Sequence, residues 1–168
     1  WVDAAVTAVA TGGIAAVAVE PLAARLGATK GSFYWHFANR DALLDAALLH
    51  WEHTDTEAVI ALVEAEPDPT TRLHTLLTVA IGRDGRPGGR VELALLATPD
   101  HPLVAPVLAR VTRRRVDYLE RTFAQLGFPD EQARQRGLLA YTAYLGHAQL
   151  VHATPELAPT GAALAAYV

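Results

Sequence analysis

A short stretch of this chain collects polar side chains that are scarce in the rest of it. The sequence contains one lysine, Lys30, one serine, Ser32, and one asparagine, Asn39, and the run Tyr34-Trp35-His36 lies among them. An ammonium group, a hydroxyl group and the polar tips of such rings are hydrogen-bond donors of the kind that holds a phosphate oxygen or a base edge. The chemistry open to this stretch is therefore recognition of a charged or polar partner.

The rest of the chain offers few side chains that could serve in covalent catalysis. The sequence has no cysteine, which excludes disulfides, thiolate nucleophiles and cysteine-ligated zinc. Its one serine belongs to the polar stretch, and no glycine-rich phosphate-binding loop is present. We expect no enzymatic activity, no cofactor and no metal ion. Hydrophobic residues make up 51% of the chain, but charges interrupt every long apolar run, so we expect no membrane span. The absence of cysteine fits a reducing compartment, and we expect a cytoplasmic protein.

Most of the polar stretch lies on the third of three predicted helices. Alanine, the best helix former, dominates the composition, and alternating strand patterns are scarce, which predicts an all-α fold. Gly12-Gly13 ends the first helix, and Thr29 caps the third, on which Phe33 and Phe37 share one inward face. These helices are predicted over residues 2–12, 19–26 and 30–37.

The second and third of these helices, with a three-residue turn between them, have the pattern of a helix-turn-helix. We expect the apolar side chains of this segment to lock the pair, namely Leu22, Leu26, Ala28 and Phe33. Lys30 and Gly31 are unfavourable in the first turn of an isolated helix, because a cation meets the positive end of the dipole and glycine costs backbone entropy. DNA would compensate for both, since phosphates neutralise the cation and glycine lets the backbone approach a groove.

Further helices follow in the same style. A long helix is predicted from Asp41 to Pro67, and a Gly/Pro-rich loop over residues 84–89. The remaining helices are predicted at 70–82, 90–97, 102–126, 130–152 and 160–168. The chain has no methionine and starts within a helical pattern, so we expect a segment before Trp1.

The motif and its surroundings resemble a known family. Residues 1–52 are similar to the DNA-binding head of the TetR family of bacterial repressors. The resemblance lies in Thr29-Lys30-Gly31-Ser32-Phe33-Tyr34-Trp35-His36-Phe37, which matches the recognition-helix signature almost position for position, and in Arg40-Asp41-Ala42-Leu43-Leu44, which matches the start of the next helix. The remainder of the chain resembles the family only in the number and lengths of its helices.

The resemblance implies a role for each residue that matches the motif. Lys30, Gly31 and Ser32 would approach base edges. The phosphate contacts would come from Thr29, Tyr34, Trp35, His36 and Arg40. One position departs from the family, because Ala18 stands where a threonine or serine often caps the second helix and touches phosphate. Residues 1–45 also carry three basic and four acidic groups, so no basic footprint supports the motif.

The family resemblance also implies how the chain is organised. It implies an N-terminal three-helix helix-turn-helix head, residues 1–45, and a helical ligand-binding and dimerisation body, residues 46–168. The function implied is a transcriptional regulator, of repressor type, that binds a double-stranded operator as a homodimer and is released by a small, mostly apolar ligand. The alternative is a helical small-molecule carrier or enzyme whose head no longer binds DNA.

Two sets of residues on the body are candidates for these further roles. A ligand would meet the aromatic and histidine side chains Trp51, His74, Tyr118, Tyr141, Tyr144 and His147, although packing in the core explains each of them as well. A partner copy would pack on a face of small and apolar residues: Leu138, Leu139, Thr142, Leu145, Gly146 and Gln149.

Two charged clusters have simpler interpretations. His50 and His53, with Glu57 one turn on, have the spacing of metal ligands, but such sets are common on solvated helix faces. The basic run of Arg110 and Arg113–Arg115 is followed by Asp117 and Glu120, so we expect it to form a solvated face.

Overall fold

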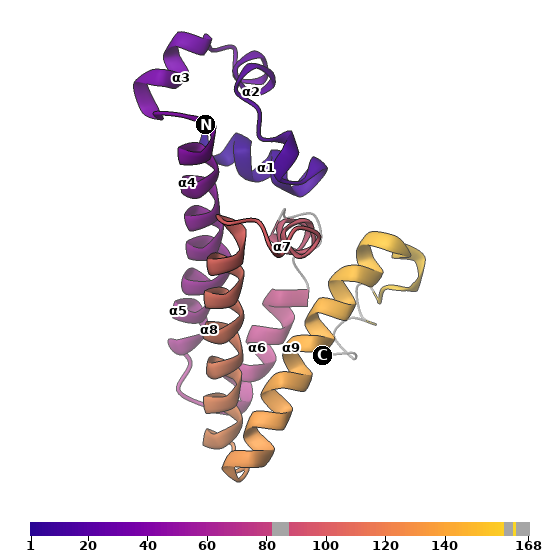
Figure 1. Cartoon of the computed structure of the whole chain (residues 1–168). Coiled ribbons are helices and arrows are strands. Elements are labelled where there is room, and N and C mark those ends of the chain that lie inside the picture. The colour runs from indigo at the N-terminus through magenta and orange to yellow at the C-terminus, as the bar shows by residue number, and fades with distance from the viewer. Residues whose placement is uncertain (82–87, 160–162, 164–168) are drawn as a thin grey trace. The chain divides into compact units, whose positions relative to one another are not determined.

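The computed structural model describes residues 1–81, 88–159 and 163, and these residues contain helices and no strand (Figure 1). The elements are α1 (Val2–Gly12), η1 (Ile14–Ala16), α2 (Val19–Arg25), α3 (Lys30–His36), α4 (Arg40–Glu52), η2 (His53–Glu57), α5 (Ala58–Glu64), α6 (Pro69–Ile81), α7 (Gly88–Leu96), α8 (Val104–Gln125), α9 (Asp130–Ala153) and η3 (Pro155–Leu157). The expected all-α fold is confirmed. None of the described helices is long and apolar enough to cross a membrane.

The chain divides into two compact units. The first comprises Trp1–Thr54 and Pro87–Arg110, and the second comprises Asp55–Arg86 and Val111–Val168. These units are defined by packing, whereas the boundary expected at residue 45 separates functions. That functional boundary stays a prediction.

The core of the first unit lies where α1 packs against α4 and α7. Small residues of α1, Ala5 and Ala8, are buried, and this lets the three helices approach closely. Buried side chains of α4 and α7 complete the core: Leu43, Leu44, Ala47, Leu48, Trp51, Val91 and Leu95. This core supports α2 and α3, which follow α1 in the chain.

Helical structure covers most of the stretch expected from Asp41 to Pro67, but it is not α-helical throughout. It begins as α4, loosens at η2 into one turn of π-helix, and resumes as α5. Thr54 Oγ1 donates to the carbonyl oxygen of His50 at 2.9 Å, so a hydroxyl competes for the helix's own acceptors at this turn. A π-helical turn contains an inserted residue that periodicity does not reveal, so the sequence pattern predicts the helix but not this turn.

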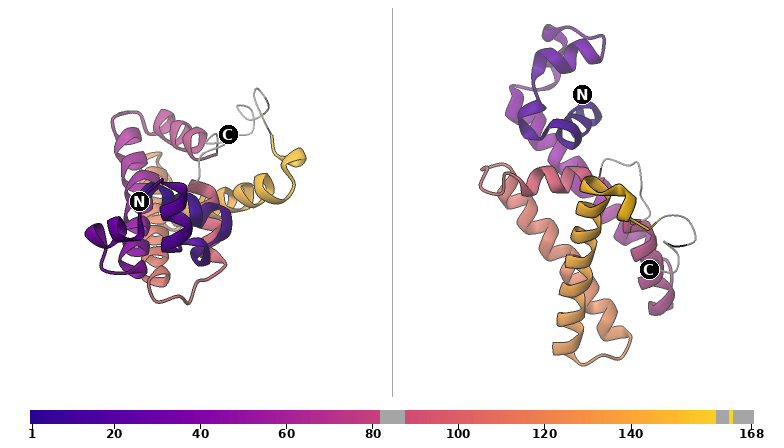
Figure 2. Two further views of the ribbon diagram at one scale, coloured as in Figure 1. Left: turned by 90° about the horizontal axis from the view of Figure 1, so that it is seen from above. Right: turned by 90° about the vertical axis from the view of Figure 1, so that its right-hand side faces the viewer.

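The second unit is built around α8 and α9, which lie side by side in Figures 1 and 2. Gly137 of α9 sits so close to α8 that a Cβ atom on it would lie 2.9 Å from the backbone nitrogen of Glu120. On the other side of α8, Tyr118 packs with Ile60 and Val63 of α5 and with Leu76 of α6. These contacts give the second unit its own apolar core.

Most of the predicted helices match the structure to within two residues at each end. The expected helix over 160–168, apart from residue 163, and part of the loop over 84–89 lie outside the described residues.

Candidate nucleic-acid interface

Buried side chains and a glycine stabilise the turn between α2 and α3. Leu22 of α2 and Phe33 of α3 are 2% and 0% exposed, so each helix contributes a buried side chain to the unit. Gly27 has a φ of +62°, a left-handed conformation that glycine adopts without strain. The expectation that Leu26 also locks the pair was wrong, because Leu26 ends α2 and its side chain is 44% exposed.

The helix α3 has two distinct sides. Thr29 caps it as expected, since its hydroxyl oxygen accepts from the backbone N–H of Ser32 at 3.1 Å. On the inner side, the Phe33 ring meets the edge of Trp1 at 5.3 Å between centroids and stacks on Phe37 at 5.6 Å. These three rings anchor α3 to the first unit and fix which of its side chains face outward.

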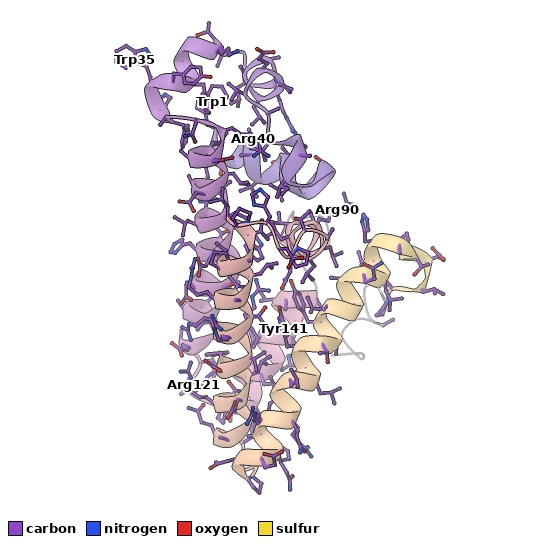
Figure 3. All side chains as sticks on the ribbon, viewed as in Figure 1. Trp1, Trp35, Arg40, Arg90, Arg121 and Tyr141 are labelled. Carbon is purple, nitrogen blue, oxygen red and sulfur yellow. The ribbon has the colours of Figure 1, made fainter. Side chains whose placement is uncertain are left out.

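The outer side of α3 carries the residues expected to bind DNA. Thr29, Lys30, Gly31, Tyr34, Trp35 and His36 are exposed, and Ser32 is half-buried. Trp35 is 89% exposed and points away from the helices (Figure 3). A tryptophan so exposed contributes little to the packing of the unit, and its DNA contact stays a prediction.

Lys30 forms an ion pair on this surface. Its ammonium nitrogen lies 2.8 Å from Oε1 of Glu20 in α2. The carboxylate raises the pKa of Lys30, and the ammonium group lowers the pKa of Glu20, first through their hydrogen bond and then through their opposite charges. Glu20 lies in the first turn of α2, where an acidic side chain also suits the helix dipole. The ten-residue separation hides the contact, which exists because the turn brings the starts of both helices together.

Arg40 points inward, unlike Trp35 (Figure 3). Its Nε donates to the carbonyl oxygen of Val17 at 2.7 Å, and a terminal nitrogen donates to that of Ile14. Its other terminal nitrogen contacts Asp41 at 3.0 Å. Arg40 thus ties α4 to the segment before α2, and its side chain remains 36% exposed. Its contact with phosphate stays a prediction.

Two features limit what this surface offers to phosphates. Ala18 precedes α2 without any side-chain cap, as its residue type predicts. Within residues 1–45, all of which the structure describes, two of the three cations, Lys30 and Arg40, are already hydrogen-bonded inside the unit. We therefore expect weak non-specific attraction of phosphates to this surface.

The residues proposed for a ligand fall in different surroundings. Trp51, Tyr118, Tyr141 and His147 are buried, Tyr144 is half-buried and His74 is exposed. Tyr118 belongs to the apolar core of the second unit. In that unit the rings of Tyr141 and Tyr144 lie 6.3 Å apart, and the Arg115 guanidinium lies 5.7 Å from the centre of the Tyr144 ring.

Among the described residues, little covers the face proposed for a partner copy. Leu138 and Leu139 of α9 are 53% and 68% exposed. Thr142, Gly146 and Gln149 are exposed too, whereas Leu145 is half-buried. Two adjacent leucines in water are unfavourable, so this face is a candidate for burial in an assembly.

The basic run on α8 is not the freely solvated face that was expected. Arg110 binds the carboxylate of Glu52, and Arg114 binds that of Glu57 with contacts of 3.1–3.3 Å. Arg115 donates to Thr56 Oγ1 at 2.9 Å and to the carbonyl oxygen of Asp55. Three of these arginines therefore bind the turn η2 and the residue before it.

These contacts also bear on the histidines near η2. The carboxylate of Glu57 forms an ion pair with Arg114. His50 Nε2 lies 3.3 Å from a carboxylate oxygen of Asp3. Among the residues that the structure describes, no group of three or more acidic or histidine side chains is placed to hold a metal ion.

Comparisons with known proteins show what this helix-turn-helix and the whole chain are similar to. Residues 2–47 match the sequence profile described as bacterial regulatory proteins, tetR family. A transcriptional regulator from Rhodococcus sp. Rha1 has a similar structure, with a TM-score of 0.80 at 21% identity over 98% of this chain and 88% of that one. A TetR-family transcriptional regulator from Rhodococcus sp. gives 0.69 at 22% identity over 99% and 90%.

A third similar structure is the transcriptional regulator FadR from Bacillus subtilis, solved in complex with stearoyl-CoA. Its TM-score is 0.68 at 16% identity, over 98% of this chain and 90% of that one. At these identities the likeness concerns the fold. No curated protein sequence matches the chain.

Proposed function

We propose that this chain, a transcriptional regulator whose N-terminal domain is that of the TetR family, represses transcription by binding operator DNA. The observation that carries the proposal is the division of α3 into an anchored side and an exposed side. Phe33 is fully buried while Trp35 is 89% exposed, so the donors of the helix are held rigidly toward solvent. A rigid helix with outward donors is what entry into a major groove requires.

The roles proposed within this surface are those that the resemblance to the TetR family implies. Lys30, Gly31 and Ser32, at the start of α3, would approach base edges. Thr29, Tyr34, Trp35, His36 and Arg40 would hold phosphates. A regulator of this kind works in the bacterial cytoplasm, where the operator is.

A homodimer is part of the proposal. The exposed leucines of α9, Leu138 and Leu139, support it because a two-fold pair would bury the same face of both copies. Two heads would then meet successive major grooves, about 34–36 Å apart. Light scattering at micromolar concentration tests this, and a monomeric mass would contradict it.

Release by a small, mostly apolar molecule completes the proposal. The buried tyrosines and His147 offer polar handles in an otherwise apolar body. FadR, which shares this fold, holds stearoyl-CoA, a molecule with a long apolar chain. Fatty acids and their CoA thioesters are the first probes to test. A probe that raises the melting temperature but leaves operator affinity unchanged would refute the coupling.

Titration of labelled duplexes tests DNA binding directly. The duplexes are the DNA upstream of the chain's own gene and a scrambled copy at matched salt. Lys30→Ala should lose about tenfold or more on the operator and relax the preference at one base pair. Tyr34→Phe should weaken both duplexes alike, because phosphate contacts do not read sequence. Equal losses of Lys30→Ala on both duplexes would refute its base-reading role.

The competing function is a helical carrier or enzyme whose head no longer binds DNA. The uncapped Ala18 and the internally bonded cations of the head favour it. Absence of binding to any DNA by the wild-type protein at low salt would establish this alternative over the repressor.

A further inference from the structure

The contact between Glu20 and Lys30 joins an acceptor to a donor on the exposed surface of the helix-turn-helix. The carboxylate and ammonium groups are 2.8 Å apart, and the two side chains are 75% and 56% exposed. Gly31 and Tyr34, which the proposed function turns toward DNA, are exposed on the same helix as Lys30. A negative charge therefore lies beside the cation expected to read bases.

Stability does not explain this carboxylate. An ion pair between two side chains as exposed as these contributes little to folding, because water screens it and both chains lose freedom. On a surface that approaches phosphates, the same carboxylate is repelled unless it finds a donor. A donor for carboxylates is available in the major groove, where cytosine presents its N4 amino group.

The spacing of the pair matches the spacing on a base pair. In a C·G pair, cytosine N4 and guanine O6 are joined by a hydrogen bond, so the two atoms lie about 2.9 Å apart. Each keeps unused capacity toward the major groove: one N–H on N4 and one lone pair on O6. A carboxylate beside an ammonium at 2.8 Å presents the complementary acceptor and donor at nearly the same separation.

We propose that Glu20 and Lys30 together read one C·G base pair of the operator. Glu20 accepts from cytosine N4, and Lys30 donates to guanine O6 and N7. An A·T pair also has an amino group, but it places the thymine methyl where the second acceptor for Lys30 would be. This inference rests on the proposed function, because it needs the surface of α3 to enter the groove.

Glu20→Gln is the variant that tests the pair. It keeps the size of the side chain and removes the charge, and both side chains are exposed, so the melting temperature should not change. We expect the preference for C·G at one position, measured by selection from a randomised operator library, to fall about tenfold. Binding to random DNA should rise a few-fold, since one negative charge is gone and Lys30 is released.

Asp45→Asn provides the matched control. Asp45 is an exposed acid of α4 in the same unit. Removal of its charge should raise binding to all duplexes slightly and leave every base preference as it was. Lys30→Gln should lose the preference at the same base pair as Glu20→Gln, and the double variant should lose little more, because the two side chains act on one pair.

Three outcomes separate the inference from the function beneath it. Wild-type protein that selects no sequence at all would refute the proposed function. Glu20→Gln could instead keep the wild-type base preference at every position and gain affinity uniformly, as Asp45→Asn should. That result would show that Glu20 acts only as a charge and would overturn the inference. Loss of preference at one shared C·G pair supports it.

Discussion

Arg110 and Glu52 meet in a two-pronged ion pair. Nε of Arg110 donates to Oε1 at 2.6 Å and a terminal nitrogen donates to Oε2, and Glu52 is 15% exposed while Arg110 is 48% exposed. The hydrogen bond with Glu52 raises the pKa of Arg110, against a smaller opposing effect of burial. This pair joins the last turn of α4 to the start of α8 within the first unit.

The pair predicts unequal costs for its two members. Arg110→Ala leaves a largely buried carboxylate without this partner and should lower the free energy of unfolding by about 1–2 kcal/mol, reduced from the cost of a fully buried pair by the exposure of the arginine. Glu52→Gln should cost less, since an amide can still accept. Urea denaturation of the single and double variants measures the coupling, and strictly additive losses would show that the pair contributes nothing.

The close approach at Gly137 predicts a second effect on stability. Alanine there would place its methyl group 2.9 Å from the backbone nitrogen of Glu120, and backbone cannot move aside as a flexible side chain can. We expect Gly137→Ala to lower the free energy of unfolding by about 1–3 kcal/mol. Unchanged or increased stability would mean that α8 and α9 separate easily.

Sequence reasoning found the elements with local signals and missed the contacts between distant elements. Thr29, Gly27 and the Phe33/Phe37 spacing act within a few residues, so the turn and α3 could be predicted from them. The partners of Lys30, Arg110 and Arg114 lie 10 or more residues away in the chain. A single sequence carries no signal for such pairings, because the charge of each partner is equally compatible with a solvated helix face.

The start of α6 predicts a dependence of stability on pH. Oδ2 of Asp68 accepts from the backbone N–H and the hydroxyl of Thr71 at 2.8 and 2.7 Å, and these bonds lower the pKa of Asp68 in the folded state. A carboxyl group with a lowered folded-state pKa stabilises the fold fully above its ordinary pKa. That contribution is lost as the pH falls from about 4 through the lowered value.

Asp68→Asn separates this effect from capping, because asparagine caps a helix about as well and does not titrate. Melting temperatures between pH 7 and pH 3 should fall less steeply for the variant than for the wild type. Parallel curves would assign the acid sensitivity to other carboxylates.

A substitution at Gly31 should affect stability and operator affinity differently. Among the described residues, a Cβ on Gly31 meets only Thr29 Oγ1, at 3.7 Å. Alanine also favours a helix, so Gly31→Ala should keep or raise the melting temperature. If the backbone of Gly31 approaches a groove, the same methyl group should weaken operator binding about tenfold or more. Unchanged operator affinity in the stable variant would remove Gly31 from the interface.

Gly146 tests the proposed dimer by the same logic on α9. Within the described part of one chain, nothing lies within 4 Å of a Cβ built on it, so Gly146→Ala should stabilise an isolated chain by about 0.5–1 kcal/mol through helix propensity. If this face packs against a second copy, the added methyl group should instead weaken the dimer. Sedimentation equilibrium gives the dissociation constant, and urea denaturation at several concentrations gives the stability of the chain. A more stable chain with an unchanged dimer would place the interface on another surface.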